Sequence, residues 1–96
     1  MNILYKKRHY KEERFELLFR EMYPRLVRFA TTLMGDADEA RDIVSETMEQ
    51  AWKDFDRLEE TTRNAWLYAT VRNNCLNRLK HLNVEQQHVD AVIAAT

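Results

Sequence analysis

The chain has very few residues that interrupt helices: its 96 residues include one glycine, Gly35, and one proline, Pro24. A glycine-rich phosphate-binding loop needs several glycines at fixed spacing, so the sequence excludes that type of nucleotide site. β-branched residues are scattered and do not form the alternating runs that are typical of strands. The sequence therefore predicts an all-α protein, and its length supports one domain with a modest core.

Cysteines and long apolar runs are equally scarce. The single cysteine, Cys75, excludes an internal disulfide and is typical of a reducing compartment. The apolar runs are too short for a transmembrane helix. At the N-terminus the apolar residues precede the charged ones, which is the reverse of a secretory signal. We therefore expect a cytoplasmic protein that has no membrane contact.

The residues that carry catalysis or bind metals do not form a constellation. Cys75 continues an apolar helical stripe, so we expect a buried, inert thiol rather than a nucleophile. His9, His81 and His88 lack metal-ligand spacing with one another or with Cys75. We expect no enzyme activity, no metal and no cofactor.

The formal net charge of −1 conceals a strong segregation of charge along the chain. Residues 1–36 carry eight Lys/Arg against five Asp/Glu, residues 37–60 carry three against nine, and residues 61–82 carry four against none. Two partners of opposite charge would explain this basic, acidic, basic order. An unevenly charged, solvated helical bundle would explain it equally well.

The first helix is predicted from about Lys11 to Met34. Pro24 should kink it or mark a join between two shorter helices. Gly35 is expected in the left-handed conformation that ends a helix, and Asp36 is expected to cap the next one with Glu39 as its capping-box partner. The apolar stripe of the first helix consists of Phe15, Leu18, Phe19, Met22, Leu26, Phe29 and Leu33.

The second helix is predicted from about Ala37 to Phe55. Its core face consists of Ala40, Val44, Thr47, Met48, Ala51 and Phe55. Its outward face consists of Asp42, Ser45, Glu46, Glu49, Trp52 and Lys53. An outward Trp52 would suggest a contact site, whereas a position at the edge of the apolar stripe would bury most of it.

Residues 56–64 form a predicted polar loop, and Thr61 or Thr62 is expected to cap the third helix. The apolar face of that helix, over residues 66–82, consists of Leu67, Val71, Cys75, Leu79 and Leu82. The opposite face consists of Trp66, Thr70, Asn73, Asn77 and Lys80, with Arg72 and Arg78 on its flanks. Asn and Arg can bind base edges, Lys can bind phosphates and an exposed Trp can stack on an unpaired base. An ordinary solvated face is the alternative interpretation.

Two segments resemble region 2 of the extracytoplasmic-function (ECF) sigma factors, the promoter-specificity subunits of bacterial RNA polymerase. They are DIVSETMEQAW at residues 42–52 and AWLYATVRN at residues 65–73. The resemblance extends from about Phe15 to His81. It implies that the second helix docks on a coiled coil in the largest polymerase subunit, although the family commonly has Gln where Ser45 stands. The residues implied in this docking are Asp42, Ser45, Glu46, Glu49 and Trp52.

The resemblance also implies that the loop and third helix recognise the −10 promoter element and hold the displaced, single-stranded non-template strand. The positions implied in DNA binding are Arg63, Asn64, Trp66, Arg72, Asn73, Asn77 and Lys80. An anti-sigma factor is a further partner that the resemblance allows. The implied mechanism is capture of an extruded base, which stabilises melted DNA without covalent chemistry.

We expect a compact bundle of three main helices: a lead-in over residues 1–14, a region 2-like domain over 15–82, and a linker or frayed helix over 83–96. That last segment would lead toward a region 4 that is missing here, so the chain is expected to be a fragment. One alternative is a helical protein-interaction module without DNA binding. Another is a duplex-binding regulator, but long helices and a nine-residue polar loop argue against a short helix-turn-helix.

Overall fold

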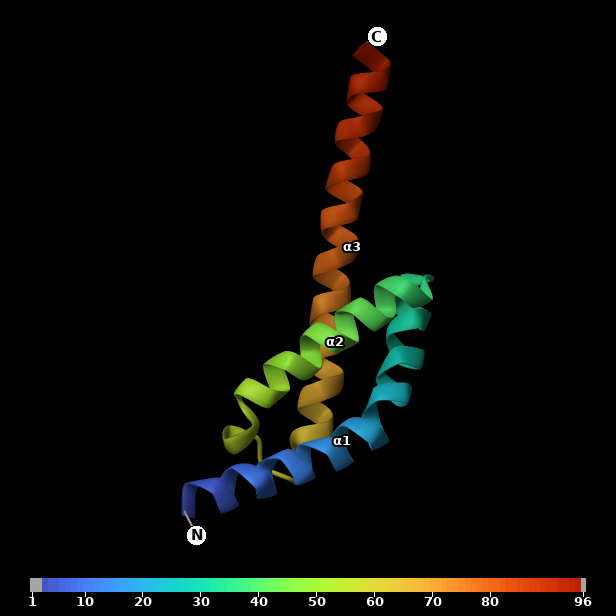
Figure 1. Ribbon diagram of the computed structural model, residues 1–96. Helices are drawn as coiled ribbons and strands as arrows, with labels where there is room; N and C mark the ends of the chain where they lie inside the picture. Colours follow the sequence, from blue (N-terminus) through green and yellow to red (C-terminus); the bar gives the residue numbers. More distant parts are fainter. Residues whose placement is uncertain (1–2, 96) are drawn as a thin grey trace.

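The structure, a computed structural model, describes residues 3–95 and contains three long helices and one short 3₁₀ helix (Figure 1). The elements in chain order are α1 (Ile3–Met34), α2 (Ala37–Lys53), η1 (Phe55–Arg57) and α3 (Arg63–Ala95). No strand occurs within the described residues. The expected all-α architecture with a polar loop before the last helix is confirmed.

Helix α1 begins at Ile3, well before the expected start at Lys11. No glycine or proline interrupts residues 3–11, and ion pairs one turn apart support this part of the helix. These pairs join Arg8 to Glu12 at 3.4 Å and His9 to Glu13 at 3.0 Å. Pro24 lies inside the helix, which runs through it and bends in the part of its length that contains this residue (Figure 1).

The corner between α1 and α2 follows the expected signals with one exception. Gly35 has φ = 69°, and the Asp36 carboxylate accepts hydrogen bonds from the backbone N–H groups of Asp38 (2.8 Å) and Glu39 (3.1 Å). The expected return bond of a capping box is wrong. The Glu39 carboxylate instead accepts a hydrogen bond from Arg78 of α3, because that charged donor forms a stronger bond than a backbone N–H.

The core lies where the three helices pack against one another. Its buried apolar members are Leu18, Met22, Leu26, Ala30, Ala40, Ile43, Val44, Met48, Ala51, Phe55, Leu67, Val71 and Cys75. Ile43 is absent from the predicted core face of α2. It is fully buried because both α1 and α3 pack on α2, which widens the apolar face beyond a single stripe. Phe19 of the predicted α1 stripe is 38% exposed and stacks on Tyr23.

Helix α3 begins at Arg63, within the segment that was predicted to be a loop. The first intrahelical bond runs from the Trp66 N–H to the Thr62 carbonyl (3.0 Å). The Thr62 hydroxyl donates to the Glu59 carbonyl (3.5 Å). Among residues 3–95, neither Thr61 nor Thr62 accepts a side-chain hydrogen bond from the first turn of α3, so the expected side-chain cap is wrong.

The C-terminal half of α3 projects beyond the other two helices (Figure 1), and the molecule measures 69 × 24 × 20 Å. Residues 83–95 continue the helix and are all exposed. Leu79 and Leu82, expected on the apolar face, are 36% and 39% exposed because α3 has passed beyond the core there. The structure does not describe Met1 and Asn2 of the expected lead-in or Thr96 of the expected linker. No described helix is both long and apolar enough to cross a membrane.

Candidate functional site

The acidic face of α2, defined as Asp42, Ser45, Glu46 and Glu49, points away from the core. These residues are spaced three and four apart, so they share one side of the helix. The side chains of Asp42, Glu46 and Glu49 are 61%, 55% and 70% exposed. The structure therefore brings together four of the five residues implied in polymerase docking.

Trp52, the fifth of these residues, lies at the edge of the acidic face. It is half-buried, and its ring packs edge-on against Phe15 of α1 with centroids 5.2 Å apart. The ammonium group of Lys11 lies 4.3 Å from its ring centroid. Trp52 therefore faces α1 more than the carboxylates of its own helix.

Arg78 of α3 ties the acidic face to the third helix. Its guanidinium donates to Glu39 (2.5 Å), Asp42 (3.3 Å) and Glu46 (3.3 Å). Burial acts to lower the pKa of Arg78, but the hydrogen bonds to Asp42 and Glu39 outweigh it and raise the pKa above its ordinary value. Arg78 therefore stays charged and partly neutralises Asp42 and Glu46 from within the molecule.

A polar stripe runs along the exposed side of α3. Trp66, Asn73, Asn77 and Lys80 follow one another at helical spacing, over about 21 Å at 1.5 Å per residue. The two asparagines and the lysine are exposed, whereas Trp66 is half-buried against the core. Only part of the Trp66 ring is therefore available to stack on a base.

The other three positions implied in DNA binding lie off this stripe. Arg72 is exposed but points about 100° around the helix from Asn73. Asn64 is exposed in the first turn of α3. Arg63 packs its guanidinium 4.3 Å from the Phe55 ring centroid and donates from Nη2 to the Leu58 carbonyl (3.0 Å). Arg63 therefore holds η1 and the following loop against the start of α3.

Asn74 is a polar contact that sequence reasoning missed. Its side-chain amide donates to the Thr47 hydroxyl (3.1 Å), which in turn donates to the Ile43 carbonyl (2.9 Å). Thr47 is fully buried, so this chain of bonds satisfies a polar group in the core and fixes α3 against α2. The sequence signal was a polar residue, Thr47, on a predicted core face.

The acidic face and the polar stripe meet along the seam between α2 and α3. A shallow hollow of about 230 Å³ is lined there by Glu46, Asn74, Asn77, Arg78 and His81. Glu46 belongs to the acidic face and Asn77 to the polar stripe. The two candidate surfaces are therefore contiguous, and Arg78 lies at their junction.

Cys75 lies on the core side of α3, one turn before Leu79. It is fully buried, as predicted. Burial raises the pKa of its thiol, and the charge of Arg78 opposes this only in part. The burial of Cys75 confirms the helical phase from which the polar stripe was predicted.

A family model for sigma-70 region 2 matches residues 18–83. The chain belongs to this family. The match spans the three-helix core, the loop and the start of the projecting part of α3. It includes every residue of both candidate surfaces.

Individual relatives are similar over a shorter stretch. The chain is 42% identical over 50 residues to proteins described as ECF RNA polymerase sigma factor SigL, from the H37Rv and Erdman strains of Mycobacterium tuberculosis. The aligned stretch covers 50% of this chain and 28% of each relative. The chain therefore spans a minor part of the length of these curated relatives. No solved structure is significantly similar to it.

Proposed function

We propose that the chain is the region 2 part of an ECF sigma factor, which docks on core RNA polymerase and holds melted promoter DNA. The observation that carries the proposal is that the acidic face of α2 and the polar stripe of α3, which lacks acidic residues, adjoin each other within the segment that matches the family. The Mycobacterium tuberculosis relatives of this domain are described as RNA polymerase sigma factors, which is consistent with that role.

The acidic face is the proposed docking surface for a coiled coil of the largest polymerase subunit. Asp42, Glu46 and Glu49 present carboxylates on one exposed side of α2, which suits a basic partner. Arg78 holds Asp42 and Glu46 in place before any partner arrives. The two carboxylates then lose less side-chain entropy on binding. Their attraction to a basic partner is weaker, however, because Arg78 already neutralises part of their charge.

The polar stripe and the loop are the proposed contact for the displaced non-template strand of the −10 element. Asn73 and Asn77 lie one turn apart and can each donate and accept hydrogen bonds at a base edge. Lys80 and Arg72 lie near the two asparagines on α3, so they can contact the phosphates of a strand whose bases those asparagines bind. No acidic residue lies between Thr61 and Leu82, so nothing on this segment repels the strand.

The proposed action is capture of unpaired bases and not chemistry. A base that leaves the duplex loses stacking, and contacts to its edge and face offset that cost only in the melted state. Such binding shifts the equilibrium toward open DNA by as much as the two states differ in affinity.

The test is a titration of the domain with core polymerase, with a single strand carrying a −10-like sequence and with the matching duplex, each at several salt concentrations. Binding to core and a preference for the strand over the duplex are expected. Core binding without any strand binding, even when the domain is bound to core, would favour the protein-interaction module. A preference for duplex would favour the duplex-binding regulator.

A further inference from the structure

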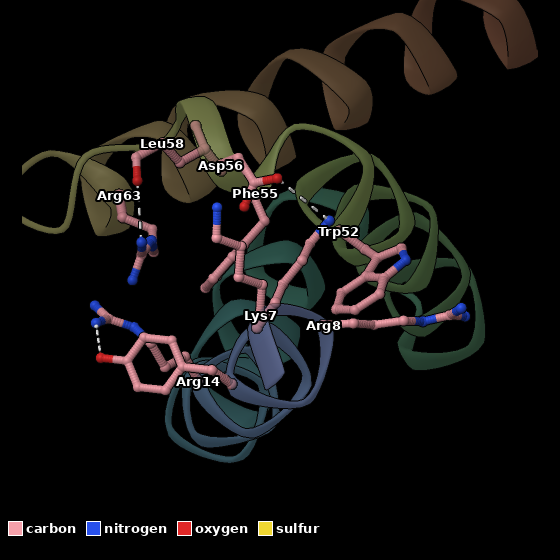
Figure 2. Close-up of a pocket in the computed structure, with 10 residues that line it drawn as sticks. Lys7, Arg8, Arg14, Trp52, Phe55, Asp56, Leu58 and Arg63 are labelled. Carbon is pink, nitrogen blue, oxygen red and sulfur yellow. Dashed lines mark hydrogen bonds and ion pairs between the residues drawn. The ribbon is translucent and has the colours of Figure 1, made fainter. Parts of the chain in front are cut away.

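A basic hollow lies at the end of the molecule formed by the N-terminal part of α1 and by η1. It has a volume of about 780 Å³, far larger than the hollow on the α2–α3 seam. Figure 2 shows its walls, with α1 side chains on one side and η1 and the following loop on the other. The residues that line it are Lys7, Arg8, Tyr10, Lys11, Arg14, Trp52, Phe55, Asp56, Leu58 and Arg63.

Cations exceed carboxylates in this hollow even after every ion pair is counted. Its lining has five cations and one carboxylate, Asp56, which pairs with Lys11 at 3.9 Å. Glu12 and Glu60, next to the lining, pair with two of the arginines. Five cations therefore face three carboxylates, and Lys7 makes no ion pair among residues 3–95. The hollow has an excess of positive charge that suits an anion.

Two guanidinium groups converge on one side of the hollow, where Figure 2 shows Arg14 and Arg63 extending toward the same space. The Nη2 atom of Arg63 donates to the Leu58 carbonyl, and its enclosed Nε atom has no hydrogen-bond partner among the described residues. Because Nε is enclosed, a ligand in the hollow would contact the Nη atoms of Arg63, of which only Nη2 forms a hydrogen bond among residues 3–95. Guanidinium groups match phosphate oxygens in geometry as well as in charge.

Aromatic side chains flank these cations. Tyr10 is 59% exposed, and its hydroxyl accepts a hydrogen bond from Arg14 (2.8 Å), which holds the ring beside the cation. Phe55 is covered by Arg63, and Trp52 by Lys11. An exposed ring next to paired arginines is the combination that binds a base and its phosphate together. A peptide carboxylate would use the cations but would leave the ring unused.

We propose that the basic hollow binds one nucleotide of a single DNA strand, with its phosphate between Arg14 and Arg63 and its base on Tyr10. This inference rests on the proposed function and extends it. Arg63 lines the hollow and also begins α3, so a strand on the polar stripe can continue into the hollow around the N-terminus of that helix. The strand path then includes α1 residues outside the segment that matches the family.

The two tryptophans allow binding in the hollow to be observed separately. In Trp66→Phe the only tryptophan left is Trp52, which lines the hollow. Oligothymidylate is expected to shield Trp52 from quenching by iodide in a saturable way, and thymidine monophosphate should do so only at much higher concentration. Absence of shielding by an oligonucleotide that still binds this variant in fluorescence anisotropy overturns the proposal. Equal shielding by polyglutamate overturns the assignment to a nucleotide.

Charge-removing variants of the otherwise unchanged protein give a second, independent measurement. Lys7→Gln and Arg14→Gln remove cations from the hollow, and Arg25→Gln is the matched control because Arg25 is exposed on α1 outside it. Each lost phosphate contact should lower the salt slope by about 0.7. A rise from about 50 to about 200 mM salt should then weaken binding to each variant about 2.6-fold less than binding to the parent.

The salt series separates failure of this inference from failure of the proposed function. Equal salt slopes for Lys7→Gln, Arg14→Gln and Arg25→Gln would overturn the hollow as a binding site while strand binding by the polar stripe stood. The proposed function depends instead on core binding and on sequence discrimination by Asn73 and Asn77. Arg63 is left unchanged throughout, because both proposals use it.

Discussion

The acidic face of α2 and the basic hollow of α1 and η1 are both charged surfaces, but they differ in how far the molecule satisfies them itself. On the acidic face, Arg78 bonds two of the exposed carboxylates, and Lys53 pairs with Glu49 at 3.6 Å. In the hollow, cations remain in excess, and Lys7 makes no ion pair among the described residues. The first surface is preorganised and partly neutralised; the second retains unused binding capacity.

This difference teaches that net charge along the sequence is a poor guide to available charge. Residues 37–60 are the most acidic segment, yet the helix packed beside them supplies an internal cation. Residues 1–36 are only moderately basic, yet the bundle gathers their first cations around one hollow. Packing, not composition, decides which charges are left for a partner.

The largest expected effect concerns Cys75, which lies on α3 three residues before Arg78. Arg78 and the carboxylates that it bonds, Glu39, Asp42 and Glu46, form the Arg78 cluster. The native thiol should react with a thiol reagent at least about 100-fold more slowly than in denaturant, because reaction requires opening of the core. The sign of the pH effect follows from its raised pKa: stability is kept below the pKa of the unfolded thiol and falls as pH rises above it. Fast native labelling at pH 7 would contradict the helical phase of α3.

The next largest effect is the loss of stability when Arg78 no longer neutralises the carboxylates of α2. Arg78→Ala removes three charge-assisted hydrogen bonds between α3 and α2. We expect a loss of about 1–2 kcal/mol in the free energy of unfolding, less than for a fully buried pair because the carboxylates reach solvent. Urea denaturation measures it. Arg20→Ala, which breaks only an exposed pair with Glu16, is the control and should change stability by less than about 0.5 kcal/mol.

Features of the fold could be predicted from the sequence where neighbouring residues determine them. Gly35 and Asp36 marked the α1–α2 corner because a left-handed turn and an N-cap are set by neighbouring residues. The core face of α3 followed from 3.6-residue spacing as far as Cys75. The early start of α1 and the continuation of α3 were underestimated, because exposed segments without an apolar stripe give no periodic signal.

For the candidate sites, the sequence predicted which residues share one face of a helix, but not which helices contact each other. Spacing placed Asp42, Glu46 and Glu49 on one face and Asn73, Asn77 and Lys80 on another. The Arg78 cluster and the basic hollow were missed because each joins residues far apart in the sequence. Both required knowledge of which helices lie side by side, and no spacing rule within one helix contains that information.

An effect of similar size is expected on base discrimination. Asn77→Ala and Asn73→Ala should each reduce discrimination between −10-like and scrambled strands by about 1–2 kcal/mol if a bidentate base contact is lost. Fluorescence anisotropy with both strands measures the change. An equal loss for both strands would show that these residues do not read bases, and Lys80→Ala is the control that should produce that equal loss.

The smallest expected effect separates two carboxylates of the acidic face. Glu49→Lys should change the free energy of unfolding by less than about 0.5 kcal/mol, because among the described residues Glu49 pairs only with Lys53, an exposed lysine one turn away. Glu46→Lys should cost slightly more, because it places a second cation beside Arg78. Both should weaken binding to core polymerase, measured by pull-down and by titration against the parent. Unchanged core affinity in both variants would count against docking by this face. A loss in Glu46→Lys alone, matched by Arg78→Ala, would show that docking depends on the Arg78 cluster and not on exposed negative charge.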